Sequence, residues 1–122
     1  MKQAVEIAKL HKAELTIVNV LPNVPYYMAS GLSSISDIET QLLEEYKGRL
    51  HAVRDKIDYD ASYVMLHGNA KQEIVRYARE IKPDLIVIGS HGHKGVTRLL
   101  GSTAANVCHR APCDVLLVRM RT

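Results

Sequence analysis

The sequence predicts an α/β fold in three layers, in which a parallel sheet is covered by helices on both faces. Segments with apolar residues at helical spacing alternate with short runs rich in β-branched residues, in the order α-β-α-β-α-β-α-β. One run, residues 85–88, is apolar throughout, as expected of a parallel strand that is covered on both faces. With 122 residues, the chain is predicted to form a single domain, residues 1–122.

Helix, strand and helix are predicted in turn over the first half of the chain. Residues 2–12 form a predicted helix and residues 14–20 a predicted strand. After a loop with two prolines, Ser36 and Glu39 form a capping box that opens a long helix over residues 36–57. The inward face predicted for the first helix contains Ala4, Ile7, Ala8 and His11. The inward face predicted for the long helix contains Ile38, Leu42, Tyr46, Leu50, Val53 and Ile57.

The second half of the chain repeats this alternation with shorter elements. Asn69 is predicted to cap a helix that ends before Pro83. The inward face of that helix is predicted to contain Ile74, Tyr77, Ala78 and Ile81. The remaining predictions are strands over 61–66, 85–88 and 115–120, a glycine-bearing loop over 89–101 and a short helix over 102–110.

The composition is that of an ordinary soluble globular protein, with 47% apolar and 24% charged residues. The net charge of +3 is mild and no run of lysine and arginine occurs, so no nucleic-acid partner is expected. No apolar stretch reaches the roughly 18 residues that a membrane span needs. The early Glu6 argues against a signal peptide, and two cysteines fit a reducing compartment. A cytoplasmic protein is therefore expected.

The loop between Ile88 and Ser102 carries the chemistry that the sequence predicts. It leaves a buried strand and ends where a helix begins, and the N–H groups and partial positive charge of a helix start favour an anion. Open parallel sheets bind ligands at the carboxyl ends of their strands. The loop's glycines allow close backbone approach to a ligand, although they could equally serve only to turn the chain. Phosphate binding is therefore predicted, without a Walker A or G-x-G-x-x-G motif.

The run from Gly89 to Ser102, followed by the segment 110–119, closely resembles the C-terminal signature of the universal stress protein family. The interval between Gly92 and Gly101 is one residue shorter than the usual pattern of the ATP-binding branch. Some bacterial members share this shorter loop, together with a Leu-Pro…Pro-Tyr-Tyr segment like the one that begins at Leu21 here. The resemblance implies the adenine nucleotide α-hydrolase-like fold and spans nearly the whole chain.

The resemblance also implies which residues hold the nucleotide, ATP or a related adenine nucleotide with Mg²⁺ as an optional companion. Gly89 and Gly92 would wrap the ribose and the first phosphates, and Gly101, Ser102 and Thr103 would hold the outer phosphates. Val20 matches the position that contacts adenine, and Ile88 precedes the glycine loop beside it. For Val20 and Ile88, a plain core role is the alternative.

The chain departs from the family at its start, because members begin with a central strand whose terminal aspartate reaches the adenine. This sequence starts directly in the helix that should follow that strand. We therefore expect an upstream strand in the natural protein. Without it, a partner chain would have to fill the gap, or the strands at 14–20 and 84–88 would have to pair directly.

Other kinds of site are weaker candidates. The five residues that suggest zinc are His91, His93, Cys108, His109 and Cys113. The spacing of the cysteines across a helix end is not that of a tight C-x-x-C zinc hairpin, so a buried Cys108 and a Cys113 at the start of a strand are expected instead. No catalytic constellation is found, so no enzyme is expected, although slow ATP hydrolysis is compatible with this reading. An adenylating ligase would need an activating residue beside the phosphates, and none stands out.

The last strand suggests how the protein assembles. It is predicted to begin at Val115, to end at Met120 and to lie at the outer edge of the sheet. The resemblance implies a homodimer in which these strands pair antiparallel, and two-fold dimers are the commonest oligomers. The expected function is that of a dimeric stress-response protein regulated by nucleotide. A nucleotide-free dimerisation and interaction module of the same fold is the alternative.

Overall fold

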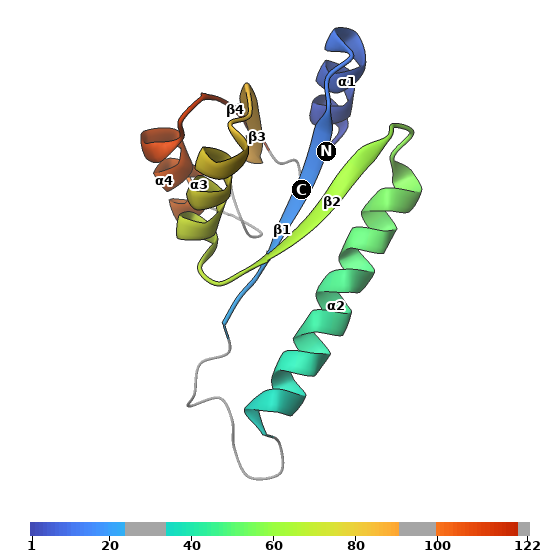
Figure 1. Ribbon diagram of the computed structural model, residues 1–122, viewed down its shortest axis with the longest axis vertical. Helices are drawn as coiled ribbons and strands as arrows, with labels where there is room; N and C mark the ends of the chain where they lie inside the picture. Colours follow the sequence, from blue (N-terminus) through green and yellow to red (C-terminus); the bar gives the residue numbers. More distant parts are fainter. Residues whose placement is uncertain (24–33, 91–99, 120–122) are drawn as a thin grey trace. The chain divides into compact units, whose positions relative to one another are not determined.

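The computed structural model describes residues 1–23, 34–90 and 100–119. The chain divides into a first unit, Met1–Asn69, and a second unit, Ala70–Thr122. The predicted alternation of helices and strands is confirmed (Figure 1). The described elements are α1 (Lys2–His11), β1 (Leu15–Leu21), α2 (Ile35–Lys56), β2 (Ala61–His67), α3 (Ala70–Ile81), β3 (Leu85–Gly89), α4 (Ser102–Arg110) and β4 (Asp114–Val118).

Among the described residues, the strands form two parallel pairs, one in each unit. β1 pairs with β2, starting with Leu15 opposite Ala61, and β3 pairs with β4, starting with Leu85 opposite Asp114. α2 connects β1 to β2, and α4 connects β3 to β4. Such a helical crossover brings the second strand parallel to the first and beside it. The α/β class and the parallel pairing are confirmed, and the upstream central strand stays a prediction.

In the first unit, α1 is fixed against the chain that follows it. Ala8 is 1% exposed, and the Tyr59 hydroxyl donates to the carbonyl oxygens of Ala8, at 3.2 Å, and of Ala13. His11 was predicted on the inward face, but it is exposed. The reason is that the helix ends there, since Lys12 adopts the left-handed conformation with φ 52° and closes the last turn.

The capping box of α2 lies two residues earlier than the one predicted at Ser36 and Glu39. The Ser34 hydroxyl accepts the Asp37 N–H at 3.1 Å, and the Asp37 carboxylate accepts the Ser34 N–H at 3.4 Å. Aspartate can therefore close the box as glutamate does, which places Ser36 inside the first turn. The predicted inward stripe of α2 is half-buried along its whole length.

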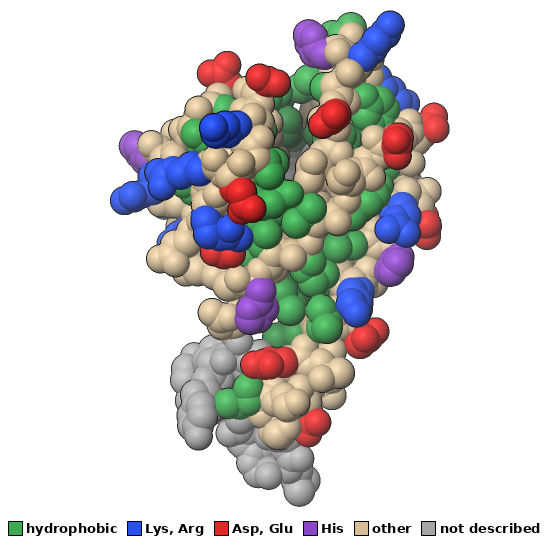
Figure 2. Space-filling view, in the orientation of Figure 1, with side chains coloured by type: hydrophobic (Ala, Val, Ile, Leu, Met, Phe, Trp, Pro, Cys, Tyr) green, Lys and Arg blue, Asp and Glu red, His purple; other side chains and the backbone are tan. Residues whose placement is uncertain are grey.

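Charged and histidine side chains are visible along α2 in the space-filling view (Figure 2). In the part of the chain that the structure describes, no helix combines the length and apolar character needed to cross a membrane.

In the second unit, α3 and α4 bury small apolar side chains. Val75 and Ala78 of α3 are each 4% exposed, and Val107 of α4 is fully buried. Val75 was not predicted to be inward, whereas the predicted Ile81 is 43% exposed because it is the last residue of α3. Cys108 was expected to be buried but is exposed, since one residue along a helix turns the side chain by about 100° from its neighbour Val107.

Candidate functional site

Most of the predicted nucleotide contacts lie in the second unit, where β3 ends and α4 begins. Val20 lies in the first unit, one residue before the end of β1 and opposite Leu66 of β2. Gly92 lies outside the described residues, as do His91 and His93. The contacts at the junction of β3 and α4 are Ile88, Gly89, Gly101, Ser102 and Thr103.

Two backbone hydrogen bonds fix this junction. The Ser90 N–H donates to the carbonyl oxygen of Val118, the last residue of β4, at 2.9 Å. The Gly101 N–H donates to the carbonyl oxygen of Ser90 at 2.7 Å. Because Ser90 directly follows β3 and Gly101 directly precedes α4, these bonds hold the start of α4 at the carboxyl ends of both strands. That edge is where open parallel sheets receive their ligands.

The first turn of α4 leaves backbone donors without a capping side chain. Gly101 is the N-cap, with φ −59° and ψ 147°, and no side chain among the described residues caps the helix. The first helical bond runs from the Ala105 N–H to the Gly101 carbonyl at 2.9 Å. The N–H groups of Ser102, Thr103 and Ala104 therefore have no acceptor within the helix. The first turn also contains no acidic residue to offset the positive end of the helix dipole.

α4 is held firmly enough to present these donors in a fixed direction. Ala104 is 2% exposed and Val107 is fully buried, so one face of the helix is packed along its length. The Asn106 side-chain amide donates to the Lys71 carbonyl of α3 at 2.8 Å, which ties the two helices together. Ser102 is exposed, so its hydroxyl is accessible to a ligand from solvent. Such an arrangement can bind a phosphate group.

The structure changes the role expected of Gly101 and adds one residue to the site. Sequence reasoning counted the Gly101 N–H among the free donors, but that group is engaged by Ser90. Ser90 was not among the predicted site residues. Its position directly after the apolar strand β3 was the available signal.

Cys113 precedes β4, as expected, at the opposite end of the strand from Val118. Partial burial, followed by the negative charges of Asp114 and Asp84, raises the pKa of the Cys113 thiol, although a backbone hydrogen bond with Ile86 lowers it. The thiol is therefore kept protonated at neutral pH. Because the thiolate is the nucleophilic form, the raised pKa makes Cys113 a weak nucleophile at neutral pH.

The chain is thus an α/β protein in which a helix without a capping side chain starts at the carboxyl end of a parallel strand. The chain belongs to the universal stress protein family, whose family model matches residues 1–119. It is 34% identical to universal stress protein A homolog 2 of Coxiella burnetii, over 99% of this chain and 84% of that protein.

Solved structures of universal stress proteins share the fold. The chain is similar to universal stress protein UspA from Lactobacillus plantarum, with a TM-score of 0.80 and 27% identity, over 97% of this chain and 86% of that one. It is also similar to a universal stress protein in complex with cAMP. In that comparison the TM-score is 0.58 and the identity 31%, over 96% of this chain and 82% of the other.

Proposed function

We propose that this protein binds ATP or a related adenine nucleotide, with its phosphates at the first turn of α4, and acts as a cytoplasmic stress-response regulator rather than as an enzyme. The observation that carries this proposal is the start of α4, which has no capping side chain and is fixed at the end of β3 by the hydrogen bond from Gly101 to Ser90. Membership of the universal stress protein family and the relative that was solved with cAMP support adenine as the base.

The energetics are sufficient for a nucleotide to bind. A hydrogen bond from a backbone N–H to a charged phosphate oxygen contributes about 1.5–3 kcal/mol. Two such bonds, from Ser102 and Thr103, would supply about 3–6 kcal/mol of the roughly 8 kcal/mol that micromolar affinity requires. The dipole of α4 adds to this attraction. The remainder would come from the base and the ribose.

Calorimetric titration of the whole chain with ATP, AMP, cAMP and adenosine tests the proposal. We expect ATP to bind, and adenosine, which lacks phosphate, to bind at least tenfold more weakly. Adding Mg²⁺ to the ATP titration then shows whether the ion contributes. Absence of any nucleotide binding at millimolar concentration would contradict the proposal and leave the interaction module as the function.

A second proposal concerns assembly, and rests on β4. This strand has one registered partner among the described residues, β3, and its Leu116 and Leu117 are 37% and 39% exposed. An apolar strand with an open edge is a site for pairing with another chain. We propose that two copies pair through β4, the described part of the strand predicted over 115–120. Met120 lies outside the described residues.

Analytical ultracentrifugation of three proteins tests this assembly. The wild-type chain should sediment as a dimer. The double variant Leu116→Glu with Leu117→Glu should be monomeric, because it brings like charges together across the two-fold axis. Leu10 is 78% exposed on α1, so Leu10→Glu is the matched control and should remain dimeric. A wild-type monomer at high micromolar concentration would contradict the proposal.

A further inference from the structure

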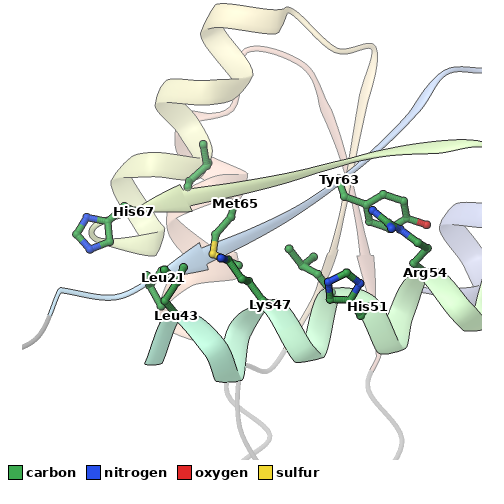
Figure 3. A pocket seen from close by; sticks show the side chains of 10 residues that line it. Leu21, Leu43, Lys47, His51, Arg54, Tyr63, Met65 and His67 are labelled. Atoms are coloured by element: carbon green, nitrogen blue, oxygen red, sulfur yellow. The ribbon is translucent and has the colours of Figure 1, made fainter. Parts of the chain in front are cut away.

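The first unit contains a pocket between α2 and the β1–β2 pair, with a volume of about 490 Å³ (Figure 3). This volume is within the range of pockets that bind small molecules. All the described residues that line it belong to the first unit. Val20, the predicted adenine contact, is not among them.

The floor of the pocket is apolar and comes from one face of the strand pair. Tyr63 and Met65 line it from β2, and Leu21 lines it from β1. Residues two apart on a strand share a face, and Leu21 is in register with His67, so these side chains lie on the same side of the pair. Leu43 and Leu50 of α2 close the apolar surface from the other side.

The polar part of the pocket is basic. Lys47, His51 and Arg54 line it from α2, where their spacing of four and three residues places them on one helical face. None of the described residues that line the pocket is acidic. Lys47 and Arg54 form no ion pair within the described part of the chain, and Arg54 lies 5.1 Å from the centre of the Tyr63 ring. The pocket therefore offers two cationic groups above an apolar floor.

We propose that this pocket binds a small amphipathic anion, a carboxylate with a medium-length alkyl or aryl body. The body would lie on Leu21, Tyr63 and Met65, and the carboxylate would meet Lys47 and Arg54. A cationic head would face two like charges, and a neutral alcohol would leave both cations without an anionic partner. The two cations of the pocket thus favour a negatively charged ligand, and the apolar floor favours a ligand with an apolar body. The proposal is independent of nucleotide binding.

Calorimetric titration of the whole chain with decanoate, decanol and decyltrimethylammonium, below their micellar concentrations, tests the proposal. We expect saturable binding of decanoate with one site per chain. Its affinity should exceed that of decyltrimethylammonium at least tenfold. Equal affinity for the anionic and cationic probes, or no saturable binding of decanoate, would overturn the proposal.

Substitutions locate the binding site. The double variant Lys47→Gln with Arg54→Gln should weaken decanoate binding about tenfold, because two partly exposed ion pairs are lost, and leave decanol binding unchanged. Lys56→Gln removes a charge from the same helix outside the pocket and should bind decanoate like the wild type. In the wild-type protein, the NMR signal of the Met65 methyl group should shift as decanoate is added. A signal that stays in place during saturable binding would overturn the proposal, whether or not the double variant folds.

Discussion

The backbone N–H of Gly101 donates to the carbonyl oxygen of Ser90 at 2.7 Å, which joins the two ends of the glycine-bearing loop. Ser90, which directly follows β3, and Gly101, which directly precedes α4, are thereby fixed together, so α4 starts at the end of β3. Binding of a phosphate at this helix start therefore does not require the backbone of Ser102 and Thr103 to be ordered by the ligand.

Replacing Gly101 tests this bond. The φ of −59° at Gly101 suits proline, but proline has no N–H to donate to Ser90. We expect Gly101→Pro to lower the free energy of unfolding by about 1 kcal/mol relative to Gly101→Ala, which keeps the donor. Urea denaturation measures the difference. Equal stability of the two variants would show that the bond contributes nothing.

A charge at Ser102 should change stability and nucleotide binding in opposite directions. Ser102→Asp places a negative charge in the first turn of α4, where the helix dipole stabilises it by about 0.3–1 kcal/mol. The same charge repels phosphate, so the affinity for ATP should fall at least tenfold. Ser102→Asn, similar in size but neutral, is the control and should retain binding. ATP affinity that is the same in both variants would place the phosphates elsewhere.

The Tyr59 hydroxyl should contribute measurably to the stability of the first unit. It donates to two carbonyl oxygens, those of Ala8 and Ala13, so Tyr59→Phe leaves both without this partner. We expect a loss of about 1–2 kcal/mol in the free energy of unfolding, measured in urea. Tyr63→Phe is the matched control, since the Tyr63 hydroxyl makes no hydrogen bond to the described residues. A loss of equal size in the control would argue against the contribution of these bonds.

Val107 anchors α4 in the second unit. Its side chain is fully buried, so Val107→Ala should lower the free energy of unfolding by about 2 kcal/mol through lost contacts and the cavity left behind. Leu10→Ala removes a larger side chain that is 78% exposed, and we expect it to change stability by less than about 0.5 kcal/mol. If Val107→Ala also weakens ATP binding, the position of α4 matters for the site.

The raised pKa of Cys113 gives the protein a testable dependence on pH. Burial is the main cause and the neighbouring Asp114 adds to it, so the folded state holds the thiol proton more tightly than the unfolded state does. The stabilisation of the folded protein by this thiol is complete at a pH below the pKa that Cys113 has in the unfolded chain. It is lost as the pH rises through the pKa that Cys113 has in the folded protein. Alkylation of Cys113 by iodoacetamide, followed by mass spectrometry, should therefore reach half its maximal rate at a higher pH in native protein than in urea. A half-maximal pH that is lower in the native protein would contradict this.

The sequence by itself determined the order and type of the elements, and it predicted a phosphate site between β3 and α4. The run at 85–88 and the helix Ser102–Arg110 could be predicted because apolar spacing and helix termini are local properties of the chain. The candidate contacts Gly101, Ser102 and Thr103 followed from their place between a strand and a helix. Even so, the start of α2 was misplaced, since Ser34 and Ser36 are each followed three residues later by an acid that can close a capping box.

Only the tertiary structure decided which strands pair, which helix faces are buried and which backbone donors remain available. The bond from Gly101 to Ser90, the burial of Val75 and the exposure of Cys108 all depend on segments that are distant in the sequence or on the exact turn of a helix. The pocket formed by Lys47, Arg54 and Met65 is of the same kind, because a helix and a strand pair must meet before it exists. The spacing of apolar residues can be seen directly in the sequence. Strand pairing and side-chain packing depend instead on contacts that the chain makes only once it has folded.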